Sequence, residues 1–134
     1  MTTLTTVYLG GLRTESTHTR SGNVLITDAP VDNNGKGEAF SPTDLVCTAL
    51  STCMLTTMGI WAAREGVDIS GMRTEVIKVM SSNPRKIAEI QVKLSQKNLV
   101  ATNDQKEKLK DIALHCPVAL SLHDSVKQLV EFDF

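Results

Sequence analysis

The sequence predicts an α+β fold built of antiparallel sheets and one long central helix. Three observations lead to this prediction: β-prone segments with no helical period, one long apolar pattern at helical spacing, and a segment that alternates between apolar and polar residues. In chain order these give three strands, a helix, two strands, a helix and a final strand. That order is typical of an α+β domain rather than of repeated β–α units. We expect a single domain over residues 1–134.

The first strands should form a meander. Residues 3–27 are rich in Thr, Val, Leu and Tyr, and they are interrupted by Gly10-Gly11 and by Ser21-Gly22-Asn23. Glycine, serine and asparagine are typical turn residues. We therefore expect three strands joined by two turns, followed by a loop over residues 28–40, where the composition is that of a loop.

The long helix should begin after Ser41. Ser41 is a good N-cap, Pro42 suits the first helical position, and Asp44 can complete a capping box. Apolar residues then recur at helical spacing as far as Ala62, and Gly66 is a suitable C-terminal stop. Because this helix is apolar on most sides, we expect it to lie inside the molecule.

The second half of the chain should add a sheet and another helix. Residues 75–96 predict two strands around a turn at Ser82-Asn83-Pro84. Thr102 with Gln105 predicts the start of a helix. Residues 126–134 alternate again and should form the last strand.

Composition argues against several classes of function. The 14 Lys and Arg residues and 15 Asp and Glu residues leave a net charge of −1, so no basic field attracts nucleic acid or anionic lipid. The first residues lack the basic and apolar regions of a signal peptide. We also identify no apolar stretch of about 18 residues that predicts a membrane span. We therefore expect a cytoplasmic protein that binds neither nucleic acid nor membrane.

The chain has three cysteines, Cys47, Cys53 and Cys116. This number is odd and small, which argues against a secreted disulfide framework. Cys116 precedes Pro117, so it should cap a short helix whose N-terminus favours a thiolate. A metal site of Cys116 with His115 and His123 remains open, although a closed zinc site requires four ligands. Cys53 lies on the apolar stripe of the long helix, where a cysteine is usually a small buried hydrophobe.

The segment "SPTDLVCTALSTC", residues 41–53, together with "HCPV", residues 115–118, resembles the OsmC/Ohr family of hydroperoxide-reducing proteins. The likeness extends to "LITDAP", "NNGKG" and the closing "VKQLVEFDF". It implies an OsmC-like fold and an intertwined homodimer with active sites at the subunit interface. It also implies that Cys53 is the peroxidatic thiol and Cys116 the resolving thiol. The implied substrate is an organic hydroperoxide, the reductant is a lipoyl-type dithiol, and no cofactor or metal is needed.

The sequence departs from the family pattern at one position. Peroxidases of this family carry a Glu directly after the helix-entry Pro and an Arg from an early strand, which together activate the first cysteine. The Glu position is Thr43 here, so Asp44 or Glu38 is the candidate carboxylate. Arg13 is the best match for the Arg, and Arg20 is the other candidate. The departure at Thr43 keeps a second reading open: a dimer that binds a small ligand or senses redox state without peroxidase turnover.

Overall fold

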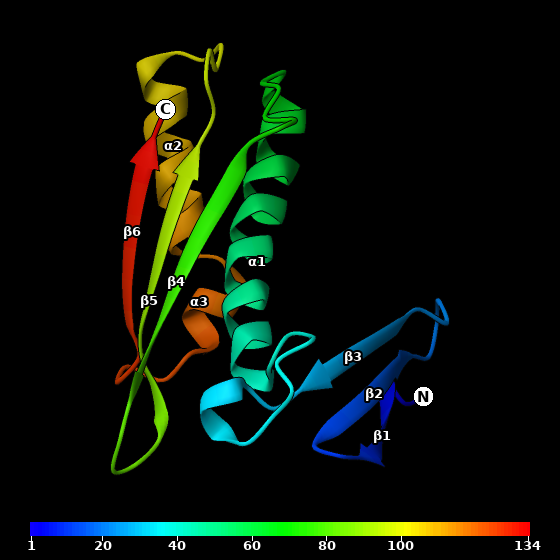
Figure 1. Ribbon diagram of the computed structural model, residues 1–134. Coiled ribbons are helices and arrows are strands. Elements are labelled where there is room, and N and C mark those ends of the chain that lie inside the picture. Colours follow the sequence, from blue (N-terminus) through cyan, green and yellow to red (C-terminus); the bar gives the residue numbers. More distant parts are fainter. The chain divides into compact units, whose positions relative to one another are not determined.

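The computed structural model describes all 134 residues (Figure 1). The elements in chain order are β1 (Leu4–Gly10), β2 (Arg13–His18), β3 (Val24–Asp28), η1 (Val31–Asn33), α1 (Pro42–Glu65), β4 (Arg73–Ser81), β5 (Lys86–Ser95), α2 (Asn103–Leu114), α3 (Pro117–Ser121) and β6 (Lys127–Asp133). The architecture is α+β, with the order of elements that the sequence predicts. The chain forms two compact units, Met1–Val46 and Cys47–Phe134.

The first unit contains a three-stranded antiparallel sheet in the order β1-β2-β3, which confirms the predicted meander. In the β1–β2 turn, φ is +84° at Gly10 and +61° at Gly11, a region that glycine adopts without steric cost. Every residue of β1 is exposed. The exposed apolar side chains of this sheet are Leu4, Val7, Tyr8, Leu9, Val24 and Leu25. The first unit therefore leaves a large apolar area uncovered.

The loop over residues 29–40 is closed by close backbone contacts. The Asp28 N–H donates to the Phe40 carbonyl at 3.1 Å, which joins the two ends of the loop. Inside the loop, a Cβ added to Gly35 would lie 1.7 Å from the Ala29 carbonyl oxygen. The backbone can approach this closely only because residue 35 has no side chain.

Capping residues set both ends of α1 as the sequence predicts. Ser41 Oγ accepts a hydrogen bond from the Asp44 N–H at 3.1 Å, and Asp44 Oδ2 accepts one from the Ser41 N–H at 3.0 Å. This reciprocal pair is a capping box, with Asp in the place of the usual Glu. At the other end, Gly66 has a φ of +67°, and the Val67 N–H donates to the Ala62 carbonyl at 2.9 Å.

Helix α1 has one buried face and one exposed stripe. The buried side chains are Cys47, Leu50, Ser51, Met54, Met58 and Ala62. The exposed stripe consists mostly of small side chains, namely Ala49, Thr52, Thr56, Ile60 and Ala63. Contrary to the sequence reading, α1 is long and apolar enough to cross a membrane, by length and composition only. The buried core helices of soluble proteins share that property.

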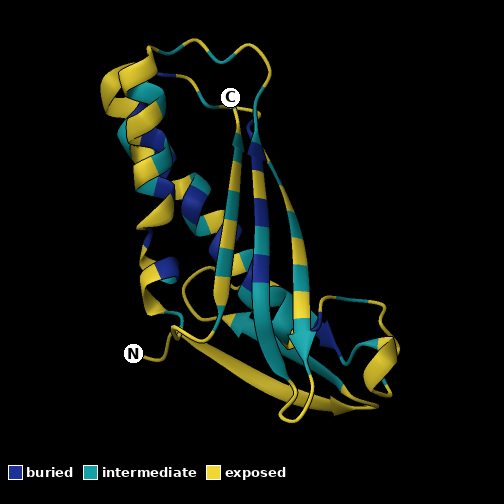
Figure 2. Ribbon diagram, turned by 90° about the vertical axis from the view of Figure 1, so that its left-hand side faces the viewer, coloured by how far each residue is buried: buried dark blue, intermediate teal, exposed yellow.

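The second unit contains a mixed sheet in the order β4-β5-β6. Strands β4 and β5 form the predicted antiparallel hairpin, whereas β6 runs parallel to β5. The expected antiparallel pairing therefore holds for β1–β2, β2–β3 and β4–β5 but not for β6. The reason is the connection: α2 and α3 carry the chain back to the end at which β5 begins, so β6 starts there too. Figure 2 shows β5 as the most buried of the three strands, between its two neighbours.

The core of the second unit joins α1 to the sheet and to α2. Its largest fully buried apolar side chains include Leu50, Met54, Met58, Ile90, Leu94 and Leu109. Helix α2 begins at the predicted capping box, in which Thr102 Oγ1 accepts from the Gln105 N–H at 3.1 Å. This core fixes the two elements that carry the candidate thiols: α1, with Cys53, and the short connection after α2, with Cys116.

Gly35→Ala should destabilise the protein by about 1–3 kcal/mol, because the added Cβ overlaps the Ala29 carbonyl and the loop must shift. Lys36→Ala, at the exposed neighbouring position, is the matched control and should change the free energy of unfolding by less than about 0.5 kcal/mol. Urea unfolding at equal protein concentration measures both. Equal midpoints for the two variants would contradict the expectation.

Candidate active site

Cys116 is the N-cap of α3, as the sequence predicts. Its φ is −66° and its ψ is 154°, and Pro117 occupies the first helical position. The Ala119 N–H donates to Cys116 Sγ at 3.4 Å. The Cys116 side chain is only 1% exposed. Its sulfur therefore lies in the interior, directed toward the start of α3.

Cys53 lies on α1, and its sulfur meets the same start of α3. The Val118 N–H donates to Cys53 Sγ at 3.5 Å. The Cys53 side chain lies close enough to the Cys116 thiol to raise the pKa of that thiol. Both cysteines are free thiols, and Cys53 is the more exposed of the two. The second unit thus brings together the two cysteines that the family resemblance singles out.

Burial raises the pKa of the Cys116 thiol, because a thiolate at this position would lose its hydration. The Ala119 N–H opposes this rise in pKa, whereas contact with Cys53 adds to it. The expectation from the N-cap position alone, a thiol biased toward thiolate, is therefore wrong in direction for Cys116. Desolvation outweighs the effect of the helix N-terminus.

The other cysteine and the two neighbouring histidines have separate surroundings. Cys47 is buried on α1, with 5% of its surface exposed. His115 Nδ1 donates to the Asp111 carbonyl at 2.8 Å, and His123 Nδ1 accepts from the Ser125 N–H at 3.0 Å. No three His, Cys, Asp or Glu side chains gather as metal ligands would. The structure therefore offers no ligand set for the metal site that the sequence left open.

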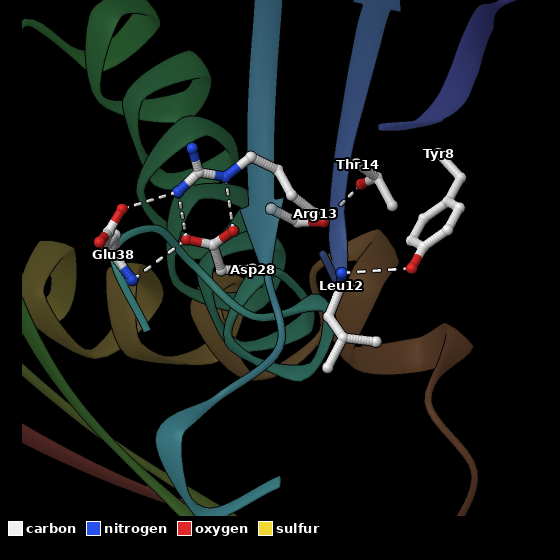
Figure 3. A network of polar contacts seen from close by, with 7 residues as sticks. Tyr8, Leu12, Arg13, Thr14, Asp28 and Glu38 are labelled. Atoms are coloured by element: carbon white, nitrogen blue, oxygen red, sulfur yellow. Dashed lines mark hydrogen bonds and ion pairs between the residues drawn. The ribbon is translucent and has the colours of Figure 1, made fainter. Parts of the chain in front are cut away.

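In the first unit, two carboxylates hold Arg13 at the start of β2 (Figure 3). Arg13 Nε donates to Asp28 Oδ1 at 2.7 Å and Nη2 donates to Asp28 Oδ2 at 2.9 Å, which makes a bidentate pair. Nη2 also donates to Glu38 Oε2 at 2.9 Å. The Asp28 side chain is 1% exposed and that of Glu38 is 65% exposed. Asp28 is therefore the principal partner of Arg13.

These contacts favour the charged forms of Arg13 and Asp28. The hydrogen bonds from Arg13 hold the pKa of the Asp28 carboxyl below its usual value, against the opposing effect of burial. Asp28 Oδ2 also accepts a hydrogen bond from the Glu38 N–H at 3.1 Å. The same two carboxylates raise the already high pKa of Arg13. Its guanidinium therefore stays protonated at every pH at which the protein is folded.

Of the two carboxylates that the sequence left open, Glu38 contacts Arg13 and Asp44 bonds the Ser41 N–H at the start of α1. The sequence analysis missed Asp28, although Asp28 lies directly opposite Arg13 in the β2–β3 register. That register is the signal that could have identified it, because opposite charges often face each other across paired strands.

Arg20 and Thr43, the other two residues of the family pattern, take no part in the hydrogen bonds of Arg13 or of the two thiols. Arg20 is exposed in the turn after β2, beyond the end of that strand opposite to Arg13. Thr43 Oγ1 lies 3.2 Å from Ser41 Oγ, in the first turn of α1. The structure thus forms two clusters: the thiol pair in the second unit, and Arg13 with its carboxylates in the first.

Comparison with known proteins decides the family. Residues 35–130 match the model of the family described as OsmC-like protein. The crystal structure of a Psychrobacter arcticus protein, described as an osmotic stress induced and detoxification response protein, is 46% identical to this chain. The match covers 98% of this chain and 96% of that one, with a TM-score of 0.94. This chain belongs to the OsmC-like family.

More distant structures share the fold of this OsmC-like protein. The organic hydroperoxide resistance protein OsmC of Legionella pneumophila is 16% identical, with a TM-score of 0.69 over 100% of this chain and 98% of that one. The organic hydroperoxide resistance protein OhrB of Bacillus subtilis is 16% identical, with a TM-score of 0.65 over 98% of each chain. Identities this low show the fold alone. No curated protein matches the sequence. The resemblance to the OsmC/Ohr family is confirmed.

In the native OsmC-like protein, iodoacetamide should alkylate Cys53 at least about tenfold faster than Cys116, because Cys53 is partly exposed and Cys116 is buried with a raised pKa. Cys47, which is also buried, is the control and should react slowly as well. Quenched time points and peptide mass spectrometry give the three rates, which should converge in guanidinium. Alkylation of Cys116 before Cys53 would show that the exposures are assigned wrongly.

The ion pair of Arg13 and Asp28 should make the OsmC-like protein sensitive to acid. Folding lowers the pKa of Asp28 below its value in the unfolded chain, which is about 3.9. The ion pair therefore stabilises the folded state fully at pH values above about 3.9, and this stabilisation is lost as the pH falls through the folded-state pKa. Asp28→Asn should lower Tm at neutral pH. On acidification, the Tm of this variant should then fall by less than the Tm of the wild type.

Thermal unfolding at about pH 7, 5 and 3 measures both effects. Glu38→Gln is the matched control for loss of an exposed carboxylate and should change Tm less than Asp28→Asn. The account is wrong if wild type and Asp28→Asn lose the same Tm between neutral and acid pH.

Proposed function

We propose that this protein is a cysteine-based thiol peroxidase that reduces organic hydroperoxides. The observation that carries the proposal is the proximity of two free thiols, Cys53 and Cys116, whose sulfurs accept hydrogen bonds from adjacent N–H groups at the start of α3. Family membership supports a peroxide-related redox role, since two proteins of the same fold are named organic hydroperoxide resistance proteins.

Cys53 is the peroxidatic thiol in this proposal because it is the more exposed of the pair. Its thiolate attacks the terminal oxygen of the hydroperoxide, so an S–O bond forms as the O–O bond breaks. The alkoxide leaves, takes up a proton and departs as an alcohol, and Cys53 becomes a sulfenic acid. In the structure, the Val118 N–H donates to the Cys53 sulfur at 3.5 Å, where it can stabilise negative charge on that atom.

Cys116 is the resolving thiol. Its sulfur attacks the sulfur of the Cys53 sulfenic acid, an S–S bond forms, and the S–O bond breaks. The departing hydroxide takes the Cys116 proton and leaves as water. Because burial raises the pKa of Cys116, this thiol stays protonated and unreactive toward hydroperoxide until the sulfenic acid forms beside it.

An external dithiol of the lipoyl type completes the cycle. One of its thiolates attacks the protein disulfide to form a mixed disulfide, and its second thiol displaces the protein sulfur. The dithiol leaves as a cyclic disulfide, and Cys53 and Cys116 return as thiols. The two electrons taken by the hydroperoxide are thereby replaced, and no metal or organic cofactor is needed in these steps.

Arg13 is the activating residue in this proposal. A guanidinium near a thiol stabilises the thiolate, and a carboxylate partner keeps the guanidinium in place. Thr43 stands where peroxidases of the family have the Glu that partners this Arg. That substitution favours the alternative function, a dimer that binds a small ligand or senses redox state without peroxidase turnover. Asp28 and Glu38 supply carboxylates to Arg13 from the first unit, which weakens that argument.

The protein is further proposed to act as a homodimer. Two surfaces support this: the uncovered apolar sheet of the first unit and the exposed stripe of small residues on α1. Small side chains allow two helix backbones to approach closely. Within the stripe, Thr52 Oγ1 donates to the Thr48 carbonyl at 2.7 Å, so this hydroxyl can be covered by a partner without losing its hydrogen bond.

Single substitutions test the roles of the two thiols. Cys53→Ser should abolish turnover of cumene hydroperoxide with dihydrolipoamide. Cys116→Ser should complete one round and accumulate a sulfenic acid that dimedone traps on Cys53. Cys47→Ser is the matched control and should keep wild-type activity.

Coupled turnover assays and peptide mapping of the dimedone adduct give the answer. Turnover in Cys53→Ser, or an adduct on Cys47, would show that the roles are assigned wrongly. If the wild-type protein consumes hydroperoxide no faster than free cysteine does, the peroxidase function is rejected. Ligand binding or redox sensing then remains as the function of the protein.

Sedimentation equilibrium tests the dimer. We expect two copies per particle at micromolar concentration, with stability that rises with protein concentration. Thr56→Glu places a charge in the exposed stripe and should shift the protein toward monomer or unfolded chain. Lys108→Glu, at an exposed position of α2, is the control and should remain dimeric. A compact and stably folded wild-type monomer would contradict the proposal.

A further inference from the structure

We infer that Cys53 and Cys116 form a chelating site for trivalent arsenicals that carry one organic group. Such a compound has two exchangeable positions on arsenic, and each position can take one sulfur. The inference goes beyond the proposed function and does not depend on turnover, because binding requires only two neighbouring thiols. It assigns a further class of ligand to the pair, one that binds without an oxidant.

The two sulfurs lie around the same turn of backbone. The Val118 N–H donates to Cys53 Sγ at 3.5 Å, and the next N–H, that of Ala119, donates to Cys116 Sγ at 3.4 Å. The Val118 N–H also lowers the pKa of the Cys116 thiol, whereas the Cys53 side chain raises it. Such effects on a pKa act over short distances. Both sulfurs are therefore within reach of one bridging atom.

The two thiols differ in how a ligand reaches them. Both are free, and both belong to the unit Cys47–Phe134, whose core holds α1 in place. Cys53 is partly exposed, whereas Cys116 is 1% exposed. An arsenical therefore meets Cys53 first, and the sulfur of Cys116 then lies beside the bound arsenic. Because the two sulfurs are already close, closing the chelate costs little conformational entropy.

Charge favours an arsenical over the metal ions that bind thiolates. Burial disfavours a charged thiolate at Cys116 and raises its pKa. Two bonds from sulfur to a monosubstituted arsenic give a neutral product, so no charge is buried. Cu(I) held by two thiolates carries a net negative charge. A closed zinc site requires four ligands, and no three His, Cys, Asp or Glu side chains gather here.

The binding step balances without electron transfer. In water, phenylarsine oxide presents arsenic with one phenyl group and two hydroxyl groups. The Cys53 sulfur displaces one hydroxyl group, which leaves as water with the thiol proton. The Cys116 sulfur displaces the second in the same way. Two S–As bonds form, two As–O bonds break, two waters are released, and no atom changes its oxidation state.

Titration of the reduced native protein with phenylarsine oxide, in the absence of hydroperoxide, tests the inference. Intact mass should show one arsenical per chain, and a thiol count should fall from three to one. Peptide mapping after alkylation should place the remaining thiol on Cys47. Excess 2,3-dimercaptopropanol, which is itself a dithiol, should remove the arsenical and restore all three thiols.

Single substitutions separate chelation from binding by one sulfur. Cys53→Ser and Cys116→Ser each leave one sulfur of the pair, and each should weaken the affinity about a hundredfold or more. Cys47→Ser is the matched control and should bind as the wild type does. Zn²⁺ at the same concentration should not protect Cys53 from iodoacetamide, because the pair supplies too few ligands. Circular dichroism checks that each variant is folded, and Cys116→Ala replaces Cys116→Ser if that variant is not.

Four results would overturn the inference. They are an affinity in the wild type no higher than in the single-cysteine variants, an adduct that includes Cys47, binding only after unfolding in guanidinium, and equal protection of Cys53 by Zn²⁺. The assay also separates the inference from the proposed function. A protein that binds the arsenical but does not consume hydroperoxide contradicts only the proposed function, and the reverse contradicts only the inference.

Discussion

Two backbone N–H groups at the start of α3 contact the two sulfur atoms of the candidate site. Ala119 donates to Cys116 at 3.4 Å, and Val118 donates to Cys53 at 3.5 Å. These donors are available because the first turn of a helix has no earlier carbonyl groups to bond. Pro117 begins the helix there. The start of this short helix therefore contacts both sulfurs, and it links α1 to the segment that follows α2.

The first unit depends on a different interaction. A buried carboxylate is costly unless a positive partner and hydrogen bonds compensate for its lost hydration. Asp28 meets this condition through Arg13 and through the Glu38 N–H. The pair constrains Arg13 in return, because it leaves only Nη1 without a partner. This unit thus holds a guanidinium in a fixed orientation through a buried bidentate pair.

Local signals in the sequence predicted much of this structure. They include both capping boxes, the glycine stops and turns, and Cys116 at an N-cap, all of which involve residues a few positions apart. The parallel direction of β6 was not predictable in this way, because it depends on how α2 and α3 return the chain along the sheet. Asp28 was missed because its role depends on the strand register that places it opposite Arg13. The raised pKa of Cys116 depends on burial, which the Cys-Pro motif does not encode.

A thiol count after a single oxidation tests the central claim most directly, that Cys53 and Cys116 act as one redox pair. The reduced chain has three free thiols. After one molar equivalent of cumene hydroperoxide, the account predicts that one thiol per chain remains, on Cys47, and that one alcohol is released for each disulfide formed. Three remaining thiols, or a disulfide that includes Cys47, would contradict it.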